Sequence, residues 1–232
     1  MRHADRYTAL RGQLTDVAER TIAEKGLAAL KARDLAREAG CAVGTIYNVF
    51  EHLDELVLCV GSRTLAMLEA TLEPVRSPVR HSSAEEAVDE IVRLALAYLE
   101  FAAAHTVRWR ALFEHRMSEA RPLPEWFVEQ QHRLFAQVER PLAALLPELD
   151  RDARRILART VFSAVHGIVA LGLEEKLVSL PLPELADQLA TTVRAIATGR
   201  DQLRAIDRGD RPADFRQAPS HPRANGRTGG GR

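Results

Sequence analysis

The chain has 232 residues, of which 46% are hydrophobic and 28% charged. A chain of this size and composition can bury a substantial core, which excludes a wholly disordered protein. Lysine and arginine balance aspartate and glutamate at 32 each. The net charge is therefore zero and does not indicate a nucleic acid or a membrane as partner. Residues 200–232 alone are basic, with 8 Lys+Arg against 4 Asp+Glu.

Cysteine content and hydropathy argue against several further classes of protein. Cys41 and Cys59 are too few and too far apart for a disulfide framework or a zinc cluster. The first residues lack the apolar segment of a signal peptide. The long uncharged stretch 161–173 is shorter than the ~20 residues that span a bilayer. We therefore expect a soluble, cytoplasmic protein with no membrane partner.

Helical periodicity dominates the N-terminal part, and we find no alternating strand pattern. Apolar residues recur there at three- and four-residue steps, and Gly26 and Gly40 follow expected helix ends. The helices predicted from this pattern cover residues 10–25, 33–39, 43–50 and 54–72.

The rest of the chain is also predicted to be helical. Either Ser82 with Glu85 or Ser83 with Glu86 forms a capping box before an amphipathic helix with apolar residues from 88 to 102. The next predicted helices cover 107–119 and a segment that starts at Pro124 and bends or breaks before Pro141. A long helix then follows to Leu177, capped by Asp150 or Asp152. The last helix is opened by Pro183 and has Leu185, Leu189, Thr192 and Ile196 on one face.

The segment 30–56 carries the main functional signal, because two short helices meet there at a turn that contains Gly40. Small and apolar residues on the first helix can pack against apolar residues on the second; they are Leu35, Ala36 and Ala39 against Val43, Ile46 and Phe50. The alanines suit two helices that cross steeply. The second helix then presents Thr45, Tyr47 and Asn48 outward, as a recognition helix does toward the major groove.

Four motifs occur here in order: AEKGL at 23–27, RDLAREAG at 33–40, VGTIYNVF at 43–50 and DEL at 54–56. In this order and spacing they resemble the TetR family of bacterial transcriptional regulators. A second resemblance concerns Val165–Gly167, a variant of the Trp-His-Gly signature of one C-terminal subgroup. Beyond these motifs, the chain agrees with the family in length and helix order.

The resemblance implies DNA contacts from the turn and the second helix. Thr45 and Tyr47 would contact phosphates or base edges, and the Asn48 amide could pair with adenine. Gly44 would let the helix backbone approach the duplex closely.

Lys31 and Arg33 occupy positions where the family contacts phosphate. Arg37 is expected to form an exposed ion pair instead. Four positions depart from residues that are frequent in the family, namely Ala42, Val43, Val49 and Leu53. Each departure removes a possible phosphate contact, which predicts modest affinity and a modest salt dependence.

Two features of the C-terminal half predict partners. The stretch 161–173 is apolar nearly all round, so its helix is either a central core helix or is shared between the core and a two-fold mate. The family resemblance favours a homodimer through helices at about 150–177 and 183–198. His166, inside this stretch, needs a hydrogen-bond partner from a backbone carbonyl, another subunit or an effector. The candidate effector-binding residues are Trp109, Phe113, Trp126, Phe162 and His166.

Two other functional classes stay open. The helix-turn-helix could be vestigial in an all-helical ligand-binding or interaction protein, as the lost phosphate contacts suggest. A helical enzyme is disfavoured, because Glu129 and His132 form a single Glu-x-x-His step and no nucleophile–base pair accompanies them. We therefore expect no catalytic, metal or cofactor site.

The prediction is an all-α protein with a three-helix DNA-binding head and a helical-bundle regulatory domain. Its parts are a helix-turn-helix domain over 1–55, an effector-binding and dimerisation domain over 56–206, and a disordered tail over 207–232, whose composition lacks apolar residues. The expected function is that of a ligand-responsive repressor. It would bind a pseudo-palindromic double-stranded DNA operator as a homodimer and respond to a small-molecule effector of unknown identity.

Overall fold

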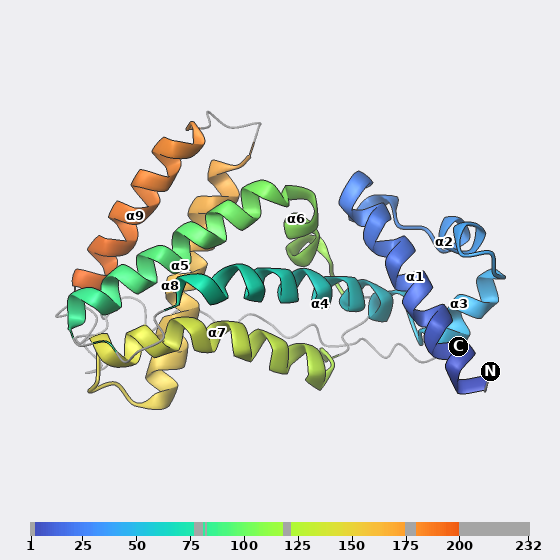
Figure 1. The fold of residues 1–232 in the computed structure, drawn as a ribbon, viewed down its shortest axis with the longest axis horizontal. Coiled ribbons are helices and arrows are strands. Elements are labelled where there is room, and N and C mark those ends of the chain that lie inside the picture. Colours follow the sequence, from blue (N-terminus) through green and yellow to red (C-terminus); the bar gives the residue numbers. More distant parts are fainter. Residues whose placement is uncertain (1–2, 77–80, 82, 118–121, 175–179, 200–232) are drawn as a thin grey trace, which may run out of the picture. The chain divides into compact units, whose positions relative to one another are not determined.

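The computed structural model describes residues 3–76, 81, 83–117, 122–174 and 180–199. This part of the chain contains α-helices and two short 3₁₀ turns and no strand (Figure 1), so the expected all-α class is confirmed. The α-helices are α1 (His3–Lys25), α2 (Ala32–Glu38), α3 (Val43–Val49), α4 (Leu53–Leu72), α5 (Ala84–Ala104), α6 (Thr106–Glu114), α7 (Glu125–Leu145), α8 (Arg151–Gly172) and α9 (Leu182–Thr198). The predicted disordered tail lies outside the described residues.

Helices α1, α2 and α3 gather at the N-terminal end of α4 and share one core with it (Figure 1). Buried side chains from all four helices form this core; among them are Leu14, Val17, Ala18, Ile22, Leu35, Ala36, Ile46, Val49, Phe50, Leu56 and Val60. Each large side chain buried there stabilises the fold by about 2 kcal/mol. The expected small residues Ala36 and Ala39 are buried at the contact between α2 and α3, whereas Val43, expected to face α2, is exposed.

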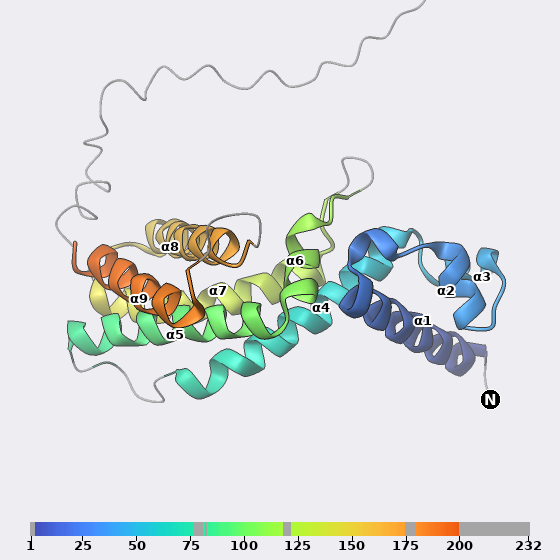
Figure 2. The ribbon, with the colours of Figure 1, turned by 90° about the horizontal axis from the view of Figure 1, so that it is seen from above.

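Helix α5 lies at the centre of the remaining helices and contacts α4, α6, α7, α8 and α9. In Figure 2, α8 and α9 lie on one side of α5 and α4 lies on the other. Ser83 caps the helix as predicted, because Ser83 Oγ accepts a hydrogen bond from the Glu86 amide at 3.1 Å, which is one of the two bonds of a capping box. The alternative cap, Ser82, lies outside the described residues. The expected apolar face of α5 is buried, including Ile91, Ala95 and Leu99.

Two helices end earlier than predicted. Helix α6 ends at Glu114 rather than at residue 119, because His115 is extended and its Nε2 lies 3.5 Å from Asp54 Oδ1 at the start of α4. Helix α8 ends at Gly172 rather than at Leu177. A Cβ atom on Gly172 would lie 2.5 Å from the Leu185 side chain, so the end of α8 and the start of α9 approach each other closely.

Two further differences concern α7 and α9. The predicted bend or break before Pro141 does not end α7, which runs on to Leu145 because Pro141, Leu142 and Leu145 are buried. The core-facing side of α9 consists of Leu185, Leu189, Val193 and Ala197. Leu185 and Leu189 were expected there, but Thr192 is exposed and Ile196 is half-buried, because the buried residues follow a strict four-residue step.

Helix α8 has an unusual distribution of apolar residues. Its buried stripe contains Ala158, Val161, Val165 and Val169, while Ile156 and Leu171 are exposed at 65% and 63%. Among the described residues, α8 is the one helix whose length and composition would also allow it to cross a bilayer. Its first nine residues contain four arginines, however.

Candidate DNA-binding helix and ligand pocket

The turn between α2 and α3 is fixed by two backbone hydrogen bonds. Gly40 adopts φ +66°, a left-handed conformation that favours glycine. Its amide donates to Arg37 O at 3.3 Å, and the Cys41 amide donates to Ala36 O at 2.9 Å. This pair is a Schellman motif, which closes α2 and directs the chain into α3. Cys41 packs against the core of the head.

Two side chains from α1 hold the opposite end of α3. The Tyr7 hydroxyl and the Arg11 guanidinium both donate to Val49 O, at 2.9 and 3.0 Å. Arg11 also donates to Glu55 Oε1 at 2.7 Å and lies over the Phe50 ring at 4.4 Å. Because a free carbonyl at a helix end needs a partner, these contacts fix α3 against α1 and α4. Sequence reasoning missed Tyr7 and Arg11.

The side chains predicted to contact DNA lie on the accessible face of α3. Tyr47 is 52% exposed, Asn48 and Gly44 are exposed, and Thr45 is half-buried. A Cβ on Gly44 would meet no atom within 4 Å, so the backbone there is open to a close approach. The core residues Ile46 and Val49 occupy the opposite face, and α3 therefore carries polar groups on a rigidly packed support.

The start of α2 supplies two exposed cations, Lys31 and Arg33. Lys31 is the residue that precedes the first turn of the helix, and Arg33 lies within that turn. Arg37 instead donates to Asp34 Oδ1 at 2.7 Å, which confirms the expected exposed ion pair. Ala42 makes no side-chain cap at the start of α3. The structure thus places the positive groups beside α3 rather than on it.

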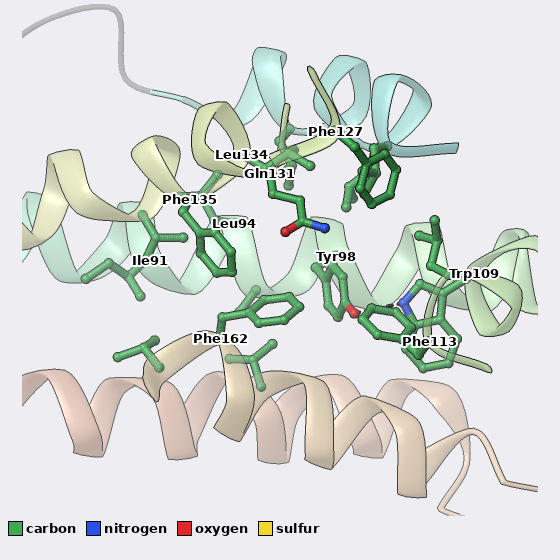
Figure 3. Close-up of a pocket in the computed structure, with 18 residues that line it drawn as sticks. Ile91, Leu94, Tyr98, Trp109, Phe113, Phe127, Gln131, Leu134, Phe135 and Phe162 are labelled. Atoms are coloured by element: carbon green, nitrogen blue, oxygen red, sulfur yellow. Dashed lines mark hydrogen bonds between the residues drawn. The ribbon is translucent and has the colours of Figure 1, made fainter. Parts of the chain in front are cut away.

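A largely apolar cavity of about 290 Å³ lies among α4, α5, α6, α7 and α8 (Figure 3). Aliphatic residues of α4 and α5 form part of its wall, and aromatic residues of α5, α6, α7 and α8 form the rest. The aromatic lining residues are Tyr98, Trp109, Phe113, Phe127, Phe135 and Phe162.

Three of the five predicted effector-binding residues line this cavity, namely Trp109, Phe113 and Phe162. Trp126 does not, since it is 41% exposed and the adjacent Phe127 takes the inward position. Sequence reasoning missed Gln131 of α7. Its spacing of four residues from both Phe127 and Phe135 places all three on one helix face, and that signal could have identified it.

His166 lies behind the cavity wall and binds to a lining residue. Its Nδ1 is 2.8 Å from the Tyr98 hydroxyl, which accepts a hydrogen bond from Trp109 Nε1 at 2.8 Å. Burial lowers the pKa of His166 and raises the pKa of Tyr98. The Tyr98 hydroxyl can then donate a hydrogen bond to Nδ1 of the neutral imidazole, in the tautomer that carries its hydrogen on Nε2. The partner of His166 is a side chain of the same chain, which is none of the three expected sources.

The lowered pKa of His166 predicts a stability change with pH. The unfolded chain takes up this proton near the ordinary pKa of about 6.5, while the folded chain resists it. The free energy of unfolding should therefore decrease as pH falls below about 6.5, and His166→Gln should reduce this decrease. Urea unfolding at pH 7.5 and 5.5 measures both slopes. A pH slope of His166→Gln equal to that of the wild type would contradict the assignment.

The titratable side chains of the described residues are spread over several helices. No group of three or more His, Cys, Asp or Glu side chains in these segments is placed to hold a metal ion. Glu129 and His132 are both exposed on α7. The two features that the structure does assemble are the outward face of α3 and the apolar cavity.

Two family models match this chain, one in its N-terminal part and one in its C-terminal part. Residues 14–59 match the family described as bacterial regulatory proteins, tetR family, and residues 91–197 match the tetracyclin repressor-like C-terminal domain. An HTH-type transcriptional regulator of Haemophilus influenzae is 41% identical over 66 residues. That match spans 28% of this chain and about a third, 35%, of the relative.

Solved structures extend the similarity over most of the chain. A Rhodococcus sp. RHA1 protein of unknown function is 25% identical, with a TM-score of 0.61 over 80% of this chain and 94% of its own. A TetR-like transcriptional regulator from Rhodococcus sp. RHA1 shares the fold at 19% identity, with a TM-score of 0.52 over 81% of this chain and 96% of its own. The subgroup suggested by Val165–Gly167 stays a prediction. Because one family model matches residues 14–59 and a second matches residues 91–197, the chain belongs to the TetR family of bacterial transcriptional regulators.

Proposed function

We propose that the protein is a ligand-responsive repressor that binds a pseudo-palindromic operator as a homodimer. The observation that carries DNA binding is the outward face of α3, where Tyr47 and Asn48 are exposed while Ile46 and Phe50 hold the helix in the core. In this proposal Thr45, Tyr47 and Asn48 contact the major groove, and the Gly44 backbone approaches the duplex. Lys31 and Arg33 contact phosphate beside it.

The proposed dimer forms through α8 and α9. One stripe of α8 faces away from its own chain and consists of Ile156, Thr160, Ser163, Gly167 and Leu171, with exposed leucine and isoleucine near its two ends. A Cβ on Gly167 would meet no atom within 4 Å, which leaves room for a second helix to approach. A two-fold pairing here would cover apolar surface that is otherwise exposed. Two heads spaced about 34 Å apart would then read successive major grooves.

The proposed response to a ligand follows from two helices that contribute to both the head and the cavity. In α4, Leu56 and Val60 belong to the head core while Leu65 and Leu68 line the cavity. In α6, Ala111 packs against the head core, and the residues on either side of it include cavity residues. A ligand that shifts α4 or α6 therefore also acts on the head.

Charged contacts join the same elements. Glu19 of α1 accepts hydrogen bonds from Arg63 of α4 and Arg108 of α6. Burial opposes ionisation of Glu19, but the two arginines outweigh it and lower its pKa. The carboxylate therefore stays charged and links α1 to both helices. A coupling of about 1–3 kcal/mol, typical of allosteric proteins, would change DNA affinity by roughly 5- to 150-fold.

The proposal includes the domain boundaries and the cellular location of the protein. We assign the helix-turn-helix domain to residues 1–55 and the effector-binding and dimerisation domain to residues 56–206, and we place the protein in the cytoplasm with its DNA. Trp109, Phe113 and Phe162 would contact the effector directly, and His166 would act on it through Tyr98.

Fluorescence anisotropy with a labelled duplex from the region upstream of the protein's own gene tests the proposal. Binding should be specific over a scrambled duplex by at least roughly 1,000-fold. The logarithm of the affinity should also decrease linearly with the logarithm of the salt concentration. The slope should be modest because few cations surround α3. If genome-wide mapping of bound sites yields no enriched sequence and the duplexes bind equally, the helix-turn-helix is vestigial and the protein is an interaction or ligand-binding module.

A further inference from the structure

We propose that the cavity binds an uncharged, mainly aromatic molecule of about two rings, and that Gln131 supplies the polar contact that selects it. This inference rests on the proposed ligand response and specifies the chemistry of the ligand. Gln131 lies on α7 between Phe127 and Phe135, and Figure 3 shows its carboxamide directed into the cavity.

The size of the cavity limits the ligand. A cavity of about 150 Å³ lined by apolar side chains accommodates benzene, and this one, at about 290 Å³, is about twice as large. Aromatic rings of Trp109, Phe113, Phe135 and Phe162 surround the space. Such rings pack edge-to-face or offset against a flat ligand, which favours a bicyclic aromatic molecule over a sugar or a peptide.

The uncharged lining residues disfavour a charged ligand. None of the described residues that line the cavity is Asp, Glu, Lys, Arg or His. The neighbouring buried carboxylate, Glu90, is already bonded to His81 and Arg140, so its charge is matched within the protein. A carboxylate or ammonium ligand would lose its hydration without gaining a counter-ion, which is costly.

The polar groups in the wall differ in what they can still bind. The Tyr98 hydroxyl and the Trp109 indole are engaged with each other and with His166. The Gln131 carboxamide, in contrast, has no hydrogen-bond partner among the described residues, whereas the adjacent Gln130 is bonded to Ser62 at 2.7 and 2.8 Å. A carboxamide both donates and accepts. Gln131 is therefore suited to a single hydroxyl or carbonyl group on an otherwise apolar ligand.

Three probes of matched shape test this inference, namely naphthalene, 2-naphthol and 2-naphthoate. Isothermal titration calorimetry on the full chain, with protein titrated into the sparingly soluble hydrocarbon, gives the three dissociation constants. One neutral hydrogen bond should make 2-naphthol bind about five-fold more tightly than naphthalene. The missing counter-ion should make 2-naphthoate bind at least roughly ten-fold more weakly than 2-naphthol.

Substitution of the glutamine separates its role from that of the cavity. Gln131→Leu, and Gln131→Met as a second variant of similar length, should remove the preference for 2-naphthol while naphthalene still binds. Gln137→Leu, the same substitution on the same helix at a buried residue outside the cavity, should preserve the preference. Thermal unfolding confirms that each variant is folded.

The inference is overturned if 2-naphthoate binds as tightly as 2-naphthol, if both Gln131 variants keep the preference, or if none of the probes binds. The anisotropy assay on the same protein distinguishes this from failure of the proposed function. Specific DNA binding with no probe bound rejects the ligand class alone. Selective probe binding without specific DNA binding supports the ligand class and rejects the proposed repressor.

Discussion

A Leu171→Arg variant is expected to be a folded monomer that binds the operator at least about 100-fold more weakly than the wild type. Leu171 is 63% exposed on α8, so arginine is tolerated within one chain. In the proposed dimer the same position lies at the interface, where an unpaired buried charge is strongly unfavourable. Two linked heads typically gain a factor of about 100 to 10,000 in affinity over one, and a monomer loses that gain.

Sedimentation velocity and anisotropy on the same samples measure the two effects. Leu123→Arg provides the matched control, because Leu123 is also exposed but lies between α6 and α7. That variant should remain a dimer with unchanged operator affinity. A Leu171→Arg protein that stays dimeric and binds DNA like the wild type would show that the exposed end of α8 lies outside the interface.

The sequence predicts the helix-turn-helix well because its determinants are local. Gly40 must take a left-handed conformation and the alanines must be small, and both requirements act within a few residues. The sequence does not reveal how α3 is held in place. Tyr7 and Arg11 contact Val49 across 42 and 38 residues, and no periodic pattern encodes a hydrogen bond between positions so distant.

The cavity shows the same limit in another form. Three of the predicted effector-binding residues, Trp109, Phe113 and Phe162, line one cavity. The rotation of α7 decided between Trp126 and Phe127, and a shift of one residue turns a side chain by about 100°. That rotation depends on the packing of α7 against α5 and α8, a tertiary property. The ends of α6 and α8 differ from prediction for a similar reason, because His115 and Gly172 respond to contacts with α4 and α9.

An Asn48→Ala variant is expected to bind the operator at least about ten-fold more weakly, with relaxed preference at one base pair in each half-site. A bidentate amide–adenine contact discriminates against other bases by about 1–3 kcal/mol. A dimer makes the contact twice, so the loss is counted in both heads. Tyr47→Ala should reduce affinity by a similar factor. Both side chains are exposed, so neither variant should change the free energy of unfolding by more than about 0.5 kcal/mol.

The salt dependence distinguishes base reading from phosphate contact. Lys31→Ala removes one cation per head, so the slope of log affinity against log salt should decrease by about two for the dimer. Asn48→Ala should leave that slope unchanged because it removes no charge. Arg37→Ala is the control. Because Arg37 is bonded to Asp34, its removal should change neither the operator affinity nor the slope. If Arg37→Ala lowers the slope while Lys31→Ala does not, DNA binds to a different side of α2, and α3 does not enter the groove by the face that carries Asn48.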